Sequence, residues 1–258
     1  MYSRPRIIPC LTMINRGLVK TVKFKNPRYL GDPINTVKIF NGKYVDELCI
    51  LDITASKEKK SPDFEYLKEI ASEAFMPLSY GGGITSIDEI EKLFYMGYEK
   101  VILNTSIINN PKLIKEAVRI AGSQSIVASI DIKKDLLSKY NCYISDGQIR
   151  IKESPQELVK KVEDLGVGEI LINSISNDGM MKGYDVELVN LISTSVQIPV
   201  IACGGAKDIY DIKKVLEDGS AHAAAAGSMF FYYGKQKAVL ITVPSEEELF
   251  NFDIYKKE

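Results

Sequence analysis

The chain of 258 residues is predicted to form one α/β domain, a (β/α)8 TIM barrel made of two related half-barrels. Three observations predict it. Short β-branched runs alternate with amphipathic stretches, eight such runs fit in this length, and the two halves of the chain repeat each other. A doubly wound open sheet is the main alternative for the same alternation. Residues 1–258 are therefore treated as a single domain.

Eight runs have the composition of buried parallel strands, and we expect them at 6–12, 47–54, 77–80, 100–104, 126–131, 169–174, 199–203 and 221–226. Helical patterns lie between most of these runs, for example at 86–96, 111–121, 155–165 and 209–217. In the first helical stretch, Ile87, Ile90, Leu93 and Phe94 share one face of a helix, which suits packing on a sheet.

An internal repeat favours the barrel over the open sheet. Pro77 and Pro199 are identical residues 122 positions apart. The same offset relates five further identical pairs: Glu47 with Glu169, Gly82 with Gly204, Gly83 with Gly205, Gly97 with Gly219, and Ser106 with Ser228. Since each pair occupies an equivalent place in its β-α unit, four units match four units. Two fused half-barrels predict that match and an open sheet does not.

Two segments interrupt the alternation. Residues 13–33 form a long loop after the first strand and are rich in basic side chains. Residues 132–153 follow the fifth strand and contain Asp146-Gly147 between alternating runs, which predicts a hairpin insertion. Both segments follow the carboxyl ends of strands, where this fold builds its functional site. A solvated basic loop without function is the alternative for 13–33.

Composition excludes several classes of protein. Lysine plus arginine total 33 and aspartate plus glutamate total 34, so the net charge is -1 and no nucleic-acid partner is expected. No apolar run approaches the roughly 18 residues of a membrane span. The start, MYSRPRIIPC, lacks the features of an export signal. We expect a cytoplasmic protein that makes no contact with a membrane.

Cysteine and histidine usage limits the chemistry further. The four cysteines contain no CxxC pair, which indicates reduced thiols rather than a disulfide framework. His222 is the single histidine, so a zinc site built on several histidines is excluded. A Ser-His-Asp triad would have to use that residue. We expect neither a metal nor a cofactor.

Two glycine-rich turns suggest phosphate binding. They lie at 80–84 and 203–206, and the strands that follow them end at 104–106 and 226–228 with further small polar residues. Glycine lets the backbone approach an anion closely, and hydroxyls and amide N–H groups then supply donors. Because the device occurs twice, it suits a substrate with a phosphate-like group at each end. Glycines that serve only tight turns are the alternative.

A carboxylate is expected at the rim of the barrel. In the fifth strand Val127, Ser129 and Asp131 share a face, which places Asp131 inward at the catalytic end. Alignment of the first strand with the fifth puts Thr12 in the corresponding position. Asp52 and Asp178 are further rim carboxylates, although Asp178-Gly179 could be a plain turn.

Four charged residues open strands at the other end of the barrel: Arg6, Glu47, Lys100 and Glu169. Strand alternation places Arg6 on the same face as Thr12, so both point inward if one does. Two positive and two negative side chains would then close the floor of the barrel, where buried charges need partners. A purely structural ring of ion pairs is the alternative.

Taken together, these residues resemble the cyclase subunit of imidazole glycerol phosphate synthase, the HisF family, over nearly the whole chain. The matching motifs are RIIPCL at 6–11, GDP at 31–33, DEL with LDITAS at 46–56, GGGI at 81–84, NTS at 104–106, GSQ at 122–124, SID at 129–131, DG with GYD at 178–185, and IACGGA at 201–206.

The resemblance implies a glutaminase subunit docked at the bottom of the barrel, from which ammonia crosses to a bis-phosphorylated substrate at the top. The ammonia gate would be Arg6, Glu47, Lys100 and Glu169. The substrate phosphate-binding positions would be Lys20, Gly83, Asn104, Thr105, Asp178, Gly179, Gly204, Gly205 and Ser228. The catalytic positions would be Asp131 and Thr12.

One departure changes the expected reaction. The family has two catalytic aspartates, and Thr12 stands in place of one of them. A threonine cannot supply a proton as a carboxylic acid does, so cyclisation should be severely impaired. The segment 18–33 looks like a paralogue linked to glycosyl amidation of surface sugars, in which a separate amidotransferase uses the ammonia to make an acetamidino group. A histidine-pathway cyclase and a non-catalytic ammonia conduit that activates its glutaminase are the alternatives.

Overall fold

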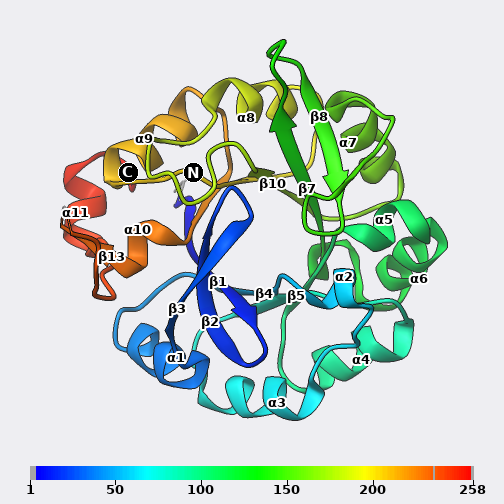
Figure 1. Cartoon of the computed structure of the whole chain (residues 1–258), viewed down its shortest axis with the longest axis horizontal. Coiled ribbons are helices and arrows are strands. Elements are labelled where there is room, and N and C mark those ends of the chain that lie inside the picture. Colours follow the sequence, from blue (N-terminus) through cyan, green and yellow to red (C-terminus); the bar gives the residue numbers. More distant parts are fainter. Residues whose placement is uncertain (1–3, 235, 257–258) are drawn as a thin grey trace.

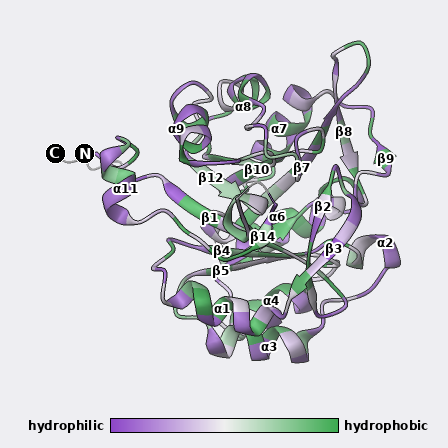
Figure 2. Cartoon of the chain, turned by 60° about the vertical axis from the view of Figure 1, so that its left-hand side comes forward, coloured by the Kyte–Doolittle hydropathy of each residue, from purple (hydrophilic) through white to green (hydrophobic). Residues whose placement is uncertain are grey.

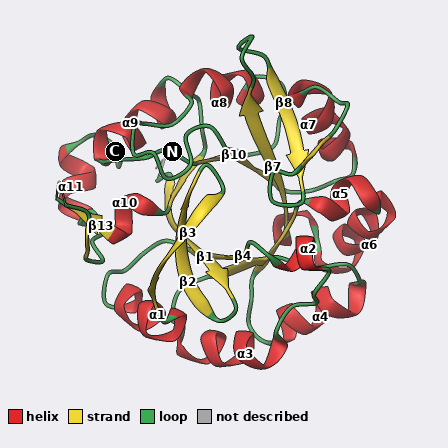
Figure 3. Ribbon diagram, viewed as in Figure 1, coloured by secondary structure: helices red, strands yellow, loops and turns green. Residues whose placement is uncertain are grey.

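The computed structural model describes residues 4–234 and 236–256. Within these residues, eight parallel strands close into a barrel surrounded by helices, as the sequence predicts (Figures 1 and 3). In chain order the barrel strands are β1 (Arg6–Ile14), β4 (Leu48–Asp52), β5 (Leu78–Gly81), β6 (Lys100–Leu103), β7 (Ile126–Lys134), β10 (Glu169–Ser174), β11 (Val200–Cys203) and β12 (Ala223–Ala226). Pairing of β7 with β10 and of β12 with β1 closes the ring.

Helices follow the strands and cover the outside of the barrel. They are α1 (Pro33–Asn41), α2 (Ala55–Glu58), α3 (Phe64–Glu73), α4 (Ile87–Tyr95), α5 (Thr105–Asn109), α6 (Pro111–Ala121), α7 (Pro155–Asp164), α8 (Val186–Ser193), α9 (Ile209–Glu217), α10 (Ser228–Phe231) and α11 (Glu246–Asn251). A short 3-10 helix spans Ser123–Ser125. In α4, Ser86 and Glu89 form a capping box, while Ile90 and Leu93 are buried against the strands. None of the described helices is long and apolar enough to cross a membrane.

The segment 13–33 is not the irregular loop that its polar composition predicts. It forms a β-hairpin of β2 (Gly17–Val22) and β3 (Lys25–Gly31), and β2 pairs antiparallel with the end of β1. The two reversals use Asn15-Arg16 and Lys23-Phe24, all four with positive φ. Three of these four residues are of types that rarely adopt this conformation, so the turn residues gave no signal of a hairpin.

The segment 132–153 continues β7 and adds β8 (Tyr140–Ile144) and β9 (Ile149–Arg150), paired antiparallel. Asp146 and Gly147 adopt positive φ in the turn between β8 and β9. Both hairpins lie on the side of the molecule opposite the two termini (Figure 2). A further two-stranded sheet pairs β13 (Tyr232–Tyr233) with β14 (Ala238–Val239).

Two hydrophobic clusters stabilise the barrel. The larger lies between the strands and the helices and includes Phe40, Tyr80 and Phe230. The smaller fills the lumen with Ile8, Cys10, Cys49, Ile102, Val127, Leu171, Ile201, Cys203, Ala223 and Ala225, against which Leu51 packs. The alternate residues of each strand therefore belong to different clusters, as expected for a sheet that is covered on both faces.

Candidate functional site

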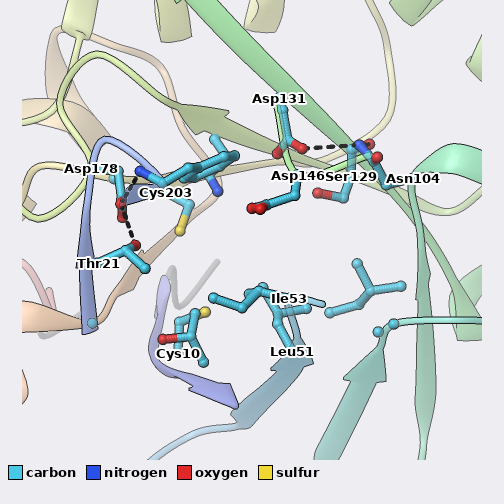
Figure 4. A pocket seen from close by; sticks show the side chains of 18 of the residues that line it. Cys10, Thr21, Leu51, Ile53, Asn104, Ser129, Asp131, Asp146, Asp178 and Cys203 are labelled. Atoms are coloured by element: carbon cyan, nitrogen blue, oxygen red, sulfur yellow. Dashed lines mark hydrogen bonds between the residues drawn. The ribbon is translucent and has the colours of Figure 1, made fainter. Parts of the chain in front are cut away.

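A polar cavity lies over the carboxyl ends of the barrel strands, between the two hairpins (Figure 4). It encloses about 1180 Å3, part of which is open to solvent. All the candidate catalytic and phosphate-binding residues line it: Thr12, Lys20, Gly83, Asn104, Thr105, Asp131, Asp178, Gly179, Gly204, Gly205 and Ser228. The tertiary structure thus collects at one place side chains that come from every quarter of the sequence.

Asp131 lies on β7 with its carboxyl group facing the cavity (Figure 4). The side-chain amide of Asn104 donates to its Oδ2 at 3.3 Å and to the Ser129 carbonyl at 2.9 Å. Burial and, to a lesser extent, the nearby carboxylates of Asp146 and Asp178 together raise the pKa of Asp131 to about 7, against the effect of a hydrogen bond from Asn173. A carboxyl group with this pKa can both donate and accept a proton near neutrality.

This raised pKa predicts that Asp131 lowers stability as the pH rises. The unfolded chain releases the proton near pH 3.8, but the folded chain holds it until about pH 7, so the folded state binds more protons in this window. The Asp131→Asn variant lacks this dependence. We expect its free energy of unfolding, relative to wild type, to increase by on the order of 4 kcal/mol between pH 4 and pH 8. Urea denaturation of both proteins at the two pH values measures it, and parallel pH profiles would contradict it.

Thr12 stands at the end of β1, and its hydroxyl donates to the Val19 carbonyl of the β2–β3 hairpin. The Lys20 ammonium donates to the Cys10 carbonyl at 2.6 Å and lies 3.4 Å from the Thr12 hydroxyl. Lys20 is buried, and desolvation lowers its pKa. The position at which the resemblance leads us to expect an aspartate is therefore occupied by a hydroxyl, with a lysine adjacent to it.

Both glycine turns have two consecutive residues with positive φ. Gly82 and Gly83 have φ of 131° and 70°, and their counterparts Gly204 and Gly205 have φ of 91° and 111°. A Cβ at Gly83 would lie 2.2 Å from the Lys60 carbonyl oxygen, and a Cβ at Gly205 would lie 2.2 Å from that of Gly183. Only glycine fits either turn, which accounts for the repeat without needing a ligand. The turns face the same cavity from the two half-barrels.

Asp178 and Gly179 hold the β2–β3 hairpin over the cavity. Thr21 donates its hydroxyl to Asp178 Oδ2 at 2.8 Å, and the Phe24 N–H donates to the same atom at 3.3 Å (Figure 4). A Cβ at Gly179 would lie 2.0 Å from the Thr21 carbonyl oxygen. In this structure the Asp178 carboxylate is therefore engaged by the hairpin. Burial raises its pKa.

The sequence analysis missed two residues of the cavity. Asp146, on the turn between β8 and β9, brings a third carboxylate beside Asp131 (Figure 4). Its pKa is raised by burial. Asn173 is buried, and its Oδ1 has no hydrogen-bond partner among the described residues. The Asp146-Gly147 pair predicted only a turn, and the position of Asn173, an even number of residues after Glu169 in a buried strand, suggests a shared face but no role.

The four charged residues at the amino ends of the strands form a paired ring, which we call the charged ring: Arg6, Glu47, Lys100 and Glu169. Arg6 pairs with Glu169 and, at 2.6 Å, with Glu47. Lys100 lies 2.9 Å from Glu47 and 3.0 Å from Glu169. Each cation contacts both anions, so the charges neutralise one another at the floor of the lumen.

Residues 4–234 and 236–256 contain neither a Ser-His-Asp triad in the cavity nor a metal site. His222 lies at the amino end of β12, away from the cavity, and its Nδ1 accepts the N–H of Val200 at 3.2 Å. It cannot serve a triad with groups of the cavity. No group of three or more histidine, cysteine, aspartate or glutamate side chains in these two ranges is arranged to hold a metal ion.

Fold and site together define the class of protein. It is a (β/α)8 barrel with a polar cavity at the carboxyl ends of its strands and two half-barrels that present equivalent glycine turns to that cavity. Comparison of sequences then gives the family. Residues 6–237 match the family described as histidine biosynthesis protein. The chain belongs to this family, in the HisF branch.

Three relatives show the closeness of this relationship. A protein of Pseudomonas aeruginosa, provisionally named imidazole glycerol phosphate synthase subunit hisF2, is 48% identical over 95% of this chain and 98% of its own length. A Vibrio vulnificus protein provisionally named subunit hisF3 is 46% identical over 95% of each chain. The imidazole glycerol phosphate synthase subunit HisF of Petrotoga mobilis is 41% identical over 88% of this chain and 90% of its own length. The resemblance predicted from the motifs is thus confirmed.

Proposed function

We propose that this protein is a HisF-like subunit that receives ammonia from a glutaminase partner and conducts it through its barrel, for amidation of a bacterial surface sugar. One observation carries the proposal. The four residues that the resemblance assigns to the gate form a paired ring, whereas Thr12 stands where the resemblance expects a catalytic carboxylate. A barrel that has the charged ring but lacks one of two catalytic carboxylates is better suited to deliver ammonia than to consume it.

The proposed passage would run from the charged ring to the cavity, between the side chains that fill the lumen. Above the ring, the lumen is lined by Ile8, Cys10, Cys49 and Leu51, all apolar or weakly polar. Such a wall favours neutral ammonia over ammonium, because moving a charge out of water into apolar surroundings is costly. Ammonia released at the amino face would therefore travel in the form that reacts as a nucleophile.

The two faces of the barrel suit two partners. A HisH-like glutaminase would dock at the amino face, beside the charged ring. At the other face the cavity would deliver ammonia to a sugar amidotransferase, which forms the acetamidino group. The paired glycine turns and the Ser228 hydroxyl would hold phosphate groups of a small molecule at the same mouth.

A second candidate function is the histidine-pathway cyclase, which converts PRFAR and ammonia to imidazole glycerol phosphate and AICAR. The observation that favours it is Asp131, whose pKa of about 7 suits a general acid or base. The glycine turns of the two half-barrels face the same cavity, which suits a substrate with two phosphate groups. The rate of cyclisation in wild type and in the Thr12→Asp variant separates this candidate from the first.

Transfer of labelled nitrogen tests the proposal. The chain is combined with the HisH-type glutaminase and the sugar amidotransferase of the same organism, and given amide-15N glutamine with unlabelled ammonium. We expect labelled acetamidino product only when the chain is present, because passage through the lumen avoids mixing with bulk ammonium. Label that is diluted to the bulk ratio would contradict conduction. Labelled product in reactions without the chain would do the same.

A further inference from the structure

Three cysteines from distant parts of the sequence meet in the lumen. They are Cys10 on β1, Cys49 on β4 and Cys203 on β11, and we call them the thiol cluster. All three are free and buried, and the sulfur atoms of Cys10 and Cys49 lie 3.8 Å apart. Cys142 is also free and buried, but it belongs to the outer cluster of the core. The chain therefore carries its own matched control thiol.

The backbone already places Cys10 and Cys49 within reach of a disulfide. They are direct partners in the register of the parallel strands β1 and β4. Neighbouring strands lie about 4.8 Å apart, and disulfides join Cα atoms separated by about 4.4–6.8 Å. A bond between the two sulfurs would therefore need side-chain rotation and a small local adjustment rather than a rearrangement of the barrel.

Cys10 is the more reactive member of the pair. Hydrogen bonding with the side chains of Cys203 and then Cys49 holds its pKa well below the ordinary value, with help from the nearby Lys20 ammonium and against the effect of burial. The pKa of Cys49 is raised well above its ordinary value, so it keeps its proton. The thiolate form is the nucleophile in sulfur chemistry. Cys10 and Cys203 line the cavity, which gives a water-sized oxidant a route to the cluster (Figure 4).

We propose that Cys10 and Cys49 form a redox-modification site at which hydrogen peroxide produces a disulfide inside the barrel. The Cys10 sulfur attacks one peroxide oxygen, the O–O bond breaks, and sulfenic acid and water form. The Cys49 sulfur then displaces that oxygen as a second water, and the S–S bond closes. Two thiols lose two electrons and two protons in total, and one peroxide becomes two waters.

The position of the site gives the disulfide a consequence. Strand β1 carries Arg6 below Cys10, and Glu47 lies just before β4 below Cys49, so the bond would tie the two chain segments that share the 2.6 Å ion pair of the charged ring. It would also change the wall between the ring and the cavity. This consequence rests on the proposed function, since it matters only if ammonia passes there. The sulfur chemistry itself does not.

Oxidation of the full chain tests the site. The purified protein is treated with a small excess of hydrogen peroxide, quenched, and analysed by intact mass and peptide mapping. We expect wild type and the Cys142→Ser control to lose the mass of two hydrogen atoms and to yield a linked peptide of Cys10 and Cys49, reversed by dithiothreitol. Cys49→Ser should instead retain a Cys10 sulfenic acid that dimedone captures. Cys49→Ala is the second variant, should serine disturb the lumen.

Two results would overturn the proposal: two free thiols retained at Cys10 and Cys49 after treatment, or an equal loss of thiols in the Cys49 variants. A disulfide between Cys10 and Cys203 would also refute the assignment of the pair. A separate assay addresses the consequence. In the complex with the glutaminase, oxidation should lower glutamine-dependent product several-fold and leave ammonium-dependent product unchanged. Failure of this assay alone, with the disulfide formed, would count against the proposed function and not against the redox site.

Discussion

Given a HisH-type glutaminase and the histidine-pathway substrate, the protein is expected to cyclise about 10²–10⁴-fold more slowly than a cyclase with two catalytic aspartates. The reason is Thr12, whose hydroxyl donates to the Val19 carbonyl and has no acidic proton to give near neutrality. Of the two positions that the resemblance assigns to catalysis, Asp131 alone carries a carboxyl group, with a pKa of about 7. Steady-state assays of imidazole glycerol phosphate formation measure the difference.

The Thr12→Asp variant should recover part of this loss. The new carboxylate would lie beside the Lys20 ammonium, which is 3.4 Å from the present hydroxyl, and their attraction would help to keep the hairpin in place. Thr12→Val is the matched control, since it keeps the shape but has no acid, and it should remain slow. Wild-type turnover at the rate of a two-aspartate cyclase would remove the amidation proposal. No gain in Thr12→Asp would show that the hairpins have diverged as well.

The Lys100→Ala variant is expected to lose glutamine-dependent product much more than ammonium-dependent product. Lys100 bridges Glu47 and Glu169 at 2.9 and 3.0 Å, so its removal leaves Arg6 to pair with two carboxylates at the entrance to the lumen. Ammonia from the glutaminase must cross this ring, whereas ammonium from solution can reach the cavity from the open mouth. Breaking a buried ion pair also costs about 3–5 kcal/mol of stability.

Lys134→Ala is the matched control for Lys100. Lys134 also pairs with a glutamate, Glu187 at 3.0 Å, but at the exposed outer side of the β7–β8 hairpin. The Lys134→Ala variant should form as much product as wild type with either nitrogen source. The measurement is product formed with glutamine against product formed with ammonium in the intact complex, together with the free energy of unfolding. An equal fall with both nitrogen sources would mean general destabilisation, and conduction through the ring would fail.

The barrel could be predicted from the sequence because strand and helix patterns alternate regularly along the chain. Each predicted strand run corresponds to an observed strand, and the repeat at an offset of 122 fixed the closure into two halves. The β2–β3 hairpin could not be predicted from the sequence. Its turns at Asn15-Arg16 and Lys23-Phe24 contain no glycine, and the second turn is held by contacts with Asp178 from the other half of the chain. Such long-range contacts leave no local pattern.

Some features of the candidate site could likewise be predicted from the sequence, and others could not. Strand alternation placed Arg6 and Thr12 on one face, and the ion pairs of the charged ring match that placement. Asp146 was overlooked as a site residue because its distance from Asp131 depends on how the β8–β9 turn folds back. The spacing of the four cysteines showed only that no CxxC pair is present, and the contact between the sulfur atoms of Cys10 and Cys49 depends on strand register.

The sequence by itself determined the barrel, its two halves and the end of the barrel that carries the cavity. These follow from periodicity and residue type, which act locally and can be read along the chain. Only the tertiary structure decided the hairpin over the cavity, the pKa of Asp131 and the meeting of Cys10 with Cys49. Each of these depends on burial or on neighbours supplied by remote segments, and a protonation equilibrium or a sulfur contact exists only once those segments have packed.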